Sequence, residues 1–221
     1  MELYHALNRG VDQRIIFQDS RDYARFVHDL YEFNDTIPAS EFSRRNGTNV
    51  GHRMSHIREK LVDLHGWCLM KNHYHLLLSE RVEGGLSLFL RKLNVGYARY
   101  FNERHKRKGF LLQGRTKKAI IERHAHFLYI LHYIHLNPLD YLPGAKEWRI
   151  RDQNYISDAS KAFEYLNSYR WSSLLDYCGT KNFPSLITTR LFADTFDDYE
   201  KTIVDYLKES AENLPGNLRL E

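Results

Sequence analysis

The order in which two hydrophobic periodicities alternate along the chain constrains its fold most strongly. Residues 2–8 have the composition of a short strand, and residues 21–33 repeat apolar side chains every three or four positions, as an amphipathic helix does. Two apolar segments within 61–79 are separated by a polar pair, which predicts a β-hairpin. A second helical stripe covers 86–105, and 110–121 predicts a last strand. This order predicts an α+β fold, a ferredoxin-like antiparallel sheet with helices on one face.

The remaining segments suggest how the chain is divided. Residues 123–137 predict one more apolar helix, which Pro138 ends because the residue before a proline avoids helical geometry. The polar segment 37–58 has no periodic pattern and is interpreted as an insertion. We expect residues 1–140 to form the main domain and 141–221 a mostly helical C-terminal appendage packed on it.

Composition excludes several classes of protein. The chain of 221 residues has 43% hydrophobic residues, including 15 Tyr and 12 Phe, so it can bury enough surface to offset its ordering entropy. Its two cysteines cannot form a disulfide framework, and no Cys-x-x-Cys pair indicates a structural zinc site. No long apolar run predicts a membrane span. We therefore expect a globular protein of the cytoplasm.

Charge is segregated along the chain more than the net value of +4 suggests. Residues 91–123 contain eleven basic and two acidic side chains, whereas 151–221 contain eight basic and twelve acidic ones. Concentrated positive charge predicts a polyanionic partner, for which nucleic acid is the commonest case. A solvated helix face would have the same composition, so charge alone leaves both interpretations open.

The segment Asn72-His73-Tyr74-His75 lies on the second strand of the predicted hairpin. Side chains two positions apart on a strand share one face, about 7 Å apart, so the histidines project together and Tyr74 points to the other side. Two imidazoles on one face can bind a metal ion. Among 12 histidines such a pair also arises by chance. The leucines at 76–78, however, place it at the mouth of an apolar strand, where polar rings need a partner.

A second informative segment is YILHYIHLNP, residues 129–138. Residues four apart on a helix are neighbours on one face, so Tyr133 adjoins Asn137 and Tyr129 lies one turn earlier. A phenol and an amide oxygen on one face can serve as a nucleophile and a metal ligand. The same spacing also fits core aromatics followed by a helix-terminal asparagine, and spacing alone favours that structural interpretation.

Taken together, the chain resembles the single-tyrosine HUH transposases, and within them the REP-associated tyrosine transposases. The resembling segments run in family order from about residue 3 to residue 173: YHALNRG, DYARF, GWCLMKNHYHLLL, LNVGYARYFNERHKRKGFLLQGRTKK, HYIHLNPL and YRWSS. The combination is specific, although no single segment is. The sequence departs from the family pattern in three places. Lys71 stands where a proline is usual, Thr116 stands where an aromatic residue commonly follows Gly-Arg, and 37–58 is inserted.

The resemblance implies a DNA transposase that cleaves and rejoins single-stranded DNA. His73 and His75 would bind a divalent metal with Asn137 as third ligand, leaving positions for the scissile phosphate. Tyr133 would be the nucleophile and form a 5′-phosphotyrosine intermediate. A free phenol has a pKa of about 10 and is only about 0.1% phenolate at neutral pH, so activation is essential. We expect Mg²⁺ by abundance, with Mn²⁺ as an alternative because imidazole suits it.

The expected partner is single-stranded or hairpin DNA, bound by a monomer in preference to a homodimer, in association with the bacterial nucleoid. Tyr97 and Phe101 share a helix face and are expected in the core. The predicted DNA-binding residues are basic side chains of the central segment: Arg104, Lys106, Arg107, Lys108, Arg115, Lys117 and Lys118.

Three alternatives share part of this evidence. A replication-initiator or relaxase-type HUH nuclease has the same histidine pair and tyrosine chemistry, but the motif order and single tyrosine site favour a transposase. A non-catalytic or domesticated DNA-binding protein could keep the fold, although His73, His75, Tyr133 and Asn137 are intact. A zinc hydrolase is disfavoured because no other histidine has convincing third-ligand spacing: His65, His124, His126, His132 and His135.

Overall fold

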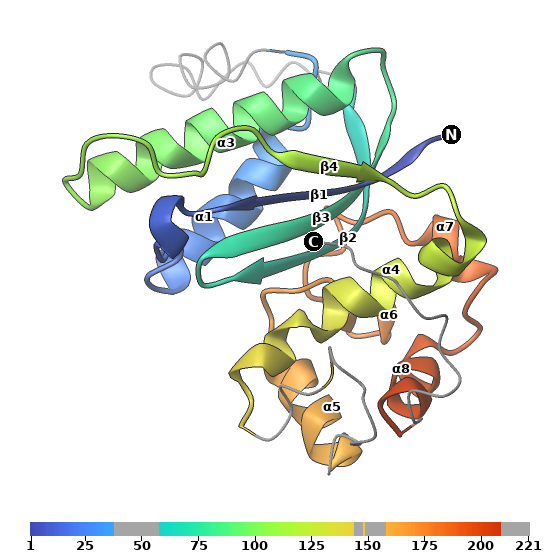
Figure 1. Ribbon diagram of the computed structural model, residues 1–221. Helices are drawn as coiled ribbons and strands as arrows, with labels where there is room; N and C mark the ends of the chain where they lie inside the picture. The colour runs from blue at the N-terminus through green and yellow to red at the C-terminus, as the bar shows by residue number, and fades with distance from the viewer. Residues whose placement is uncertain (38–57, 144–147, 149–157, 209–221) are drawn as a thin grey trace, which may run out of the picture.

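The computed structural model describes residues 1–37, 58–143, 148 and 158–208. The predicted strand, helix, hairpin, helix and strand are all present, and the sheet order β2-β3-β1-β4 is that of a ferredoxin-like fold, with every pairing antiparallel. The predicted α+β class is therefore confirmed (Figure 1). The strands are β1 (Leu3–Arg9), β2 (Val62–Met70), β3 (His73–Glu80) and β4 (Lys117–Ile120).

The helices follow the predicted segments closely. Asp19 caps the first, where its side chain accepts hydrogen bonds from the backbone of Arg21 and Asp22. The helix carrying Tyr133 ends at Leu136, and Pro138 lies in the short 3-10 helix that follows. The helical elements are η1 (Val11–Gln13), α1 (Ser20–Glu32), α3 (Gly85–Arg104), α4 (His124–Leu136), η2 (Asn137–Tyr141), α5 (Ala159–Ser168), α6 (Leu174–Tyr177), α7 (Arg190–Ala193) and α8 (Tyr199–Lys208).

One face of the sheet is covered by α1 and α3 (Figure 1). The core on this side is aromatic: the ring of Phe26 lies 5.0 Å from that of Tyr74 and 4.9 Å from that of Tyr97. Tyr97 and Phe101 are fully buried, as their shared helix face predicts. These two helices with the four strands make up the predicted ferredoxin-like unit.

The opposite face of the sheet is covered by α4 and by C-terminal elements (Figure 1). Leu77 of β3 and Leu131 of α4 belong to this second apolar cluster, together with Phe192 and Ile203 from the C-terminal part. The YRWSS segment runs beside β2, where the backbone of Leu69 donates to Trp171 and that of Ser173 donates to Trp67. The outer edge of β2 is therefore paired with the chain's own C-terminal part.

Two expectations fall at the limits of this description. The inserted segment 37–58 lies almost wholly outside the described residues. Within the residues that are described, no helix is both long and apolar enough to cross a bilayer.

Candidate active site

The histidine pair lies on the α4 face of the sheet, on strand β3. The rings of His73 and His75 approach each other edge-on, with centroids 4.9 Å apart. Tyr74 points to the other layer, where it is fully buried and its hydroxyl donates to Asn94 Oδ1 at 2.7 Å. The predicted alternation along this strand is therefore present, and it brings both imidazoles to the face against which α4 packs.

A third histidine, His5 of β1, joins the pair. Its Nε2 lies 2.9 Å from Nδ1 of His75, and the two rings stack nearly parallel with centroids 5.1 Å apart. Both side chains are buried. His5 was not among the predicted site residues, because it is 70 positions from His75. The available signal was its place in the YHALNRG segment, between Leu3 and Leu7 on one strand face.

Tyr133 is the tyrosine that α4 presents to these histidines. Its ring meets His5 edge-on with centroids 5.8 Å apart, and it meets His75 edge-on at 5.6 Å. Its side chain is only 5% exposed. Tyr129 lies one turn earlier, with its ring 6.0 Å from that of Tyr133 and 6.1 Å from that of Tyr206 in α8. The packing of α4 therefore places Tyr133, and not Tyr129, against the histidines, a difference that sequence spacing alone could not predict.

Asn137 follows one turn after Tyr133 and is fully buried. Its amide nitrogen donates to the backbone carbonyl of Tyr133 at 2.7 Å and to that of Ile134 at 3.4 Å. These bonds fix the orientation of the amide, because its nitrogen faces the helix backbone and its oxygen is the atom directed away from those carbonyls. Asn137 thus caps the end of α4 and hydrogen-bonds the turn of the helix that carries Tyr133.

The donor set of this site suits a divalent metal in one respect that the structure shows directly. Nδ1 of His73 contacts Asn72 Oδ1 at 2.7 Å, and Nδ1 of His75 contacts His5. Metal-bound imidazoles commonly use one nitrogen for the metal and the other for such a hydrogen bond. Nε2 would then be the metal-binding atom of both rings. Among the described residues, no group of three or more His, Cys, Asp or Glu side chains is arranged to hold a metal.

Two basic side chains, from β1 and β4, lie on the face of the sheet that carries His73 and His75, here called the histidine face. Arg9 of β1 stands directly opposite His73 in the antiparallel register, and Lys117 of β4 stands opposite Leu7. Directly opposed residues project to the same side of a sheet, so both cations lie on the face that carries the histidines. Arg9 was not among the predicted residues, although it is part of YHALNRG.

The other predicted DNA-binding residues have different surroundings. Arg104 pairs with Asp19 at 2.6 Å and with the fully buried Asp22, so its guanidinium joins α3 to α1. Its hydrogen bond lowers the pKa of Asp19. Lys118 lies on the α3 side of β4, where its amine donates to Ser87. Arg115 is exposed in the segment before β4.

Lys106, Arg107 and Lys108 form the turn between α3 and β4, together with Gly109 and Phe110, and we call residues 105–110 the basic loop. Lys106 and Lys108 are exposed, and Arg107 is half-buried. Burial, and secondly the positive charge of Arg14, lower the pKa of Arg107. The loop thus holds three of the seven predicted basic residues close together in sequence and in space.

The two single-residue departures from the family pattern have structural partners. The backbone N–H of Lys71 donates to the hydroxyl of Tyr141 at 2.7 Å, a bond that a proline could not make. The hydroxyl of Thr116 accepts from the amide of Asn94 at 2.7 Å, beneath Tyr74. At each of these two positions, the residue present makes a hydrogen bond where the family usually has the ring of a proline or an aromatic side chain.

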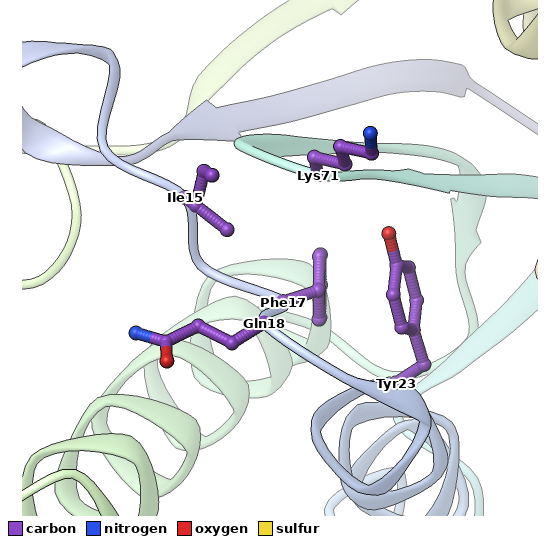
Figure 2. Close-up of a pocket in the computed structure, with 5 residues that line it drawn as sticks. All are labelled: Ile15, Phe17, Gln18, Tyr23 and Lys71. Atoms are coloured by element: carbon purple, nitrogen blue, oxygen red, sulfur yellow. The ribbon is translucent and has the colours of Figure 1, made fainter. Parts of the chain in front are cut away.

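An open hollow of about 420 Å³ adjoins the β2–β3 turn. Figure 2 shows its lining, in which Tyr23 directs its hydroxyl toward the β2–β3 turn that carries Lys71. The ring of Tyr23 stacks on Phe17 at 4.6 Å and on Trp171 at 4.9 Å. The ring of Tyr23 is therefore packed against two other aromatic rings at the edge of this hollow. The lining residues are Ile15, Phe17, Gln18, Tyr23 and Lys71.

Residues 50–137 match the family model described as IS200-like transposase. This segment contains both the histidine strand and the tyrosine helix, and over it the predicted resemblance is confirmed. The chain is also similar to the solved structure of a REP-associated tyrosine transposase bound to a REP hairpin. The identity is 10% and the TM-score 0.40, over 66% of this chain and 73% of that chain. No curated protein matches the sequence.

Proposed function

We propose that this chain, whose histidine strand and tyrosine helix match the IS200-like transposases, is a metal-dependent transposase that cleaves and rejoins single-stranded or hairpin DNA. The observation that carries the proposal is the contact of the Tyr133 ring with His5 and His75. A nucleophile and a metal-binding pair must be close enough to act on the same phosphate. The fold brings Tyr133, His5 and His75 together from three separate elements. Residues 1–140 would form the catalytic domain, and 141–221 would form an appendage packed on it.

Tyr133 supplies the nucleophile. Its phenol oxygen gives its proton to water as it attacks the scissile phosphorus, and the bond from phosphorus to the 3′-oxygen breaks. The departing 3′-oxygen takes up a proton, and the 5′-phosphate stays bound to the tyrosine. A later 3′-hydroxyl reverses these steps on another strand, so rejoining needs no nucleotide cofactor.

His73 and His75 would hold the divalent metal through Nε2, and Asn137 would add its amide oxygen. When bound, the metal polarises the phosphate and offsets the charge that develops during attack. His5 contacts Nδ1 of His75 and so holds that ring in one orientation. Mg²⁺ is the expected ion by abundance, and Mn²⁺ should serve as well because imidazole binds it readily.

Arg9 and Lys117 would contact phosphates on the histidine face, and the basic loop would follow the strand further along. The expected partner is nucleic acid in the bacterial cytoplasm, and the expected state is a monomer. Support for the monomer comes from α4, whose His132 and His135 both contact the hydroxyl of Tyr199 in α8. The tyrosine helix is thus bound to the C-terminal part of its own chain.

The test is a pair of phenylalanine variants incubated with a 3′-labelled single-stranded oligonucleotide pool and Mg²⁺ or Mn²⁺, because the fragment that stays on the tyrosine carries the 3′ end. The Tyr133→Phe variant removes one oxygen and should lose the covalent protein–DNA adduct on a denaturing gel. The matched control, Tyr129→Phe, should keep it. Adduct lost only in Tyr129→Phe would reverse the assignment. DNA binding without any adduct in the wild type would instead indicate a non-catalytic DNA-binding protein.

A further inference from the structure

Phe110 is exposed to an unusual degree. Its exposed fraction is 87%, the highest among the large hydrophobic side chains of the described residues. A phenyl ring gains stability when it leaves water, so a ring held in solvent contributes little to folding. Such a residue either is scattered on the surface by chance or contacts a partner, and its surroundings decide between these possibilities.

The backbone around Phe110 is held in place rather than left as a free tip. The guanidinium of Arg107 donates to Asn102 Oδ1 at 2.6 Å and to the carbonyl of Phe110 at 3.1 Å. The amide of Asn102 donates to the carbonyl of Gly109 at 2.9 Å. Gly109 adopts a φ of 87°, which glycine reaches without strain. These bonds fix the main chain of the basic loop and present the ring of Phe110 to solvent.

The neighbours of Phe110 are cations. Lys106 and Lys108 are exposed on the same loop, and the charge of Arg14 acts on Arg107. An aromatic ring among cations is the combination with which proteins bind single-stranded nucleic acid, since bases stack on the ring and phosphates contact the cations. In a duplex the bases already stack on one another, so an exposed ring gains little from it.

The loop lies at the end of the sheet that carries His73. After Phe110, the carbonyl of Leu111 accepts from Val11, and Leu112 pairs with Gly10. The preceding residue, Arg9, stands opposite His73. Figure 1 shows α3 extending past the sheet at this end, with the connection to β4 returning beside β1. A strand that runs from the histidine pair past Arg9 would therefore reach the basic loop.

We propose that Phe110 stacks on an unpaired base of the DNA strand bound at the histidine pair, while the cations of the basic loop contact the flanking phosphates. The inference rests on the proposed function, because it takes that strand as the ligand. It adds a base contact to a segment whose predicted DNA-binding residues are all basic.

The experiment compares the affinity of Phe110→Ala for a labelled single strand and for the duplex of the same sequence by fluorescence anisotropy. Loss of one stacked base should weaken single-strand binding about 5- to 100-fold and leave duplex binding unchanged. Phe110→Trp should bind as tightly as the wild type, whereas Phe110→Leu, which keeps bulk without a π-face, should lose most of the affinity. Val95→Ala, at a position 64% exposed on α3, is the matched control and should change neither affinity.

Wild-type affinity of Phe110→Ala for the single strand would overturn the inference, and so would an equal loss for strand and duplex. Because the ring is exposed, the melting temperature of the variants should not change. Adduct formation at saturating DNA is scored separately. Phe110→Ala should still form the adduct through Tyr133, so an unchanged affinity together with an intact adduct refutes only the stacking contact. A wild type without adduct refutes the proposed cleavage instead.

Discussion

His5 places the histidine pair in a chain of three imidazoles. His5 contacts Nδ1 of His75, and the neighbouring Asn72 contacts Nδ1 of His73. Each ring of the pair is therefore held by a neighbour at Nδ1, and under the proposed function Nε2 would be the atom that binds the metal. At the scale of single residues, the site depends on the orientation of two rings as much as on their identity.

We therefore expect His5→Ala to reduce adduct formation about 10- to 100-fold, the usual effect of removing a partner of a metal-binding histidine. His5→Gln keeps an acceptor for His75 and should recover part of the activity. The measurement is adduct yield against metal concentration. His5 acts as a positioning residue if the alanine variant needs more Mn²⁺ for half-maximal yield while binding DNA normally. A metal requirement equal to that of the wild type would contradict this role.

At the scale of elements, α1 and α3 are joined at one end by charge. Asp22 is fully buried near the start of α1, where it accepts from the backbone of Gln18 and pairs with Arg104 at the end of α3. His105 adds a contact of 3.1 Å to the same carboxylate. Arg104, predicted to bind DNA, thus joins two helices, whereas Lys106 and Lys108 of the basic loop are exposed.

This difference predicts separate effects for two variants. Arg104→Gln should lower the free energy of unfolding by about 1–3 kcal/mol, because a buried carboxylate loses a charged donor. It should leave the salt dependence of DNA binding unchanged. The double change of Lys106 and Lys108 to Gln should leave the free energy of unfolding unchanged and weaken the salt dependence of DNA binding. It should flatten the plot of log affinity against log salt by about 0.7 for each DNA phosphate that the variant no longer neutralises. Urea denaturation measures the stability of both variants, and salt titrations measure their DNA binding. Equal salt slopes for the two variants would contradict separate roles for Arg104 and the two lysines.

At the scale of the whole molecule, a buried polar network joins α4 to the C-terminal part. His135 contacts the hydroxyl of Tyr199 at 2.9 Å through Nδ1 and Ser173 Oγ at 2.7 Å through Nε2. Ser173 in turn hydrogen-bonds the backbone of Trp67 in β2. Burial, and secondly the charge of His132, lower the pKa of His135 well below its ordinary value of 6.5. The network therefore requires a neutral imidazole.

Stability should consequently fall in mild acid. Below pH 6.5 the unfolded chain binds a proton at this histidine and the folded chain does not, so acid favours unfolding. The contribution is complete above that pH and declines by about 1.4 kcal/mol per pH unit below it. His135→Gln should be less stable at pH 8 but lose less stability between pH 6.5 and 5, as measured by urea midpoints. Parallel declines for variant and wild type would show that other groups cause the acid sensitivity.

The sequence alone determined the local pattern of this protein. The strand alternation around Tyr74 and the helical periodicity depend on neighbouring residues, so the order of elements and the shared face of His73 and His75 could be predicted. The end of α4 could be predicted for the same reason, from Pro138. The domain boundary near residue 140 stays a prediction.

Only the tertiary structure decided which distant residues meet. His5 contacts His75 through the β1–β3 register, and Arg104 pairs with Asp22 because α3 ends beside α1. Tyr133 differs from Tyr129 only through the sheet against which α4 packs. Spacing cannot reveal these contacts, because they depend on how strands align and helices pack across more than 50 intervening residues.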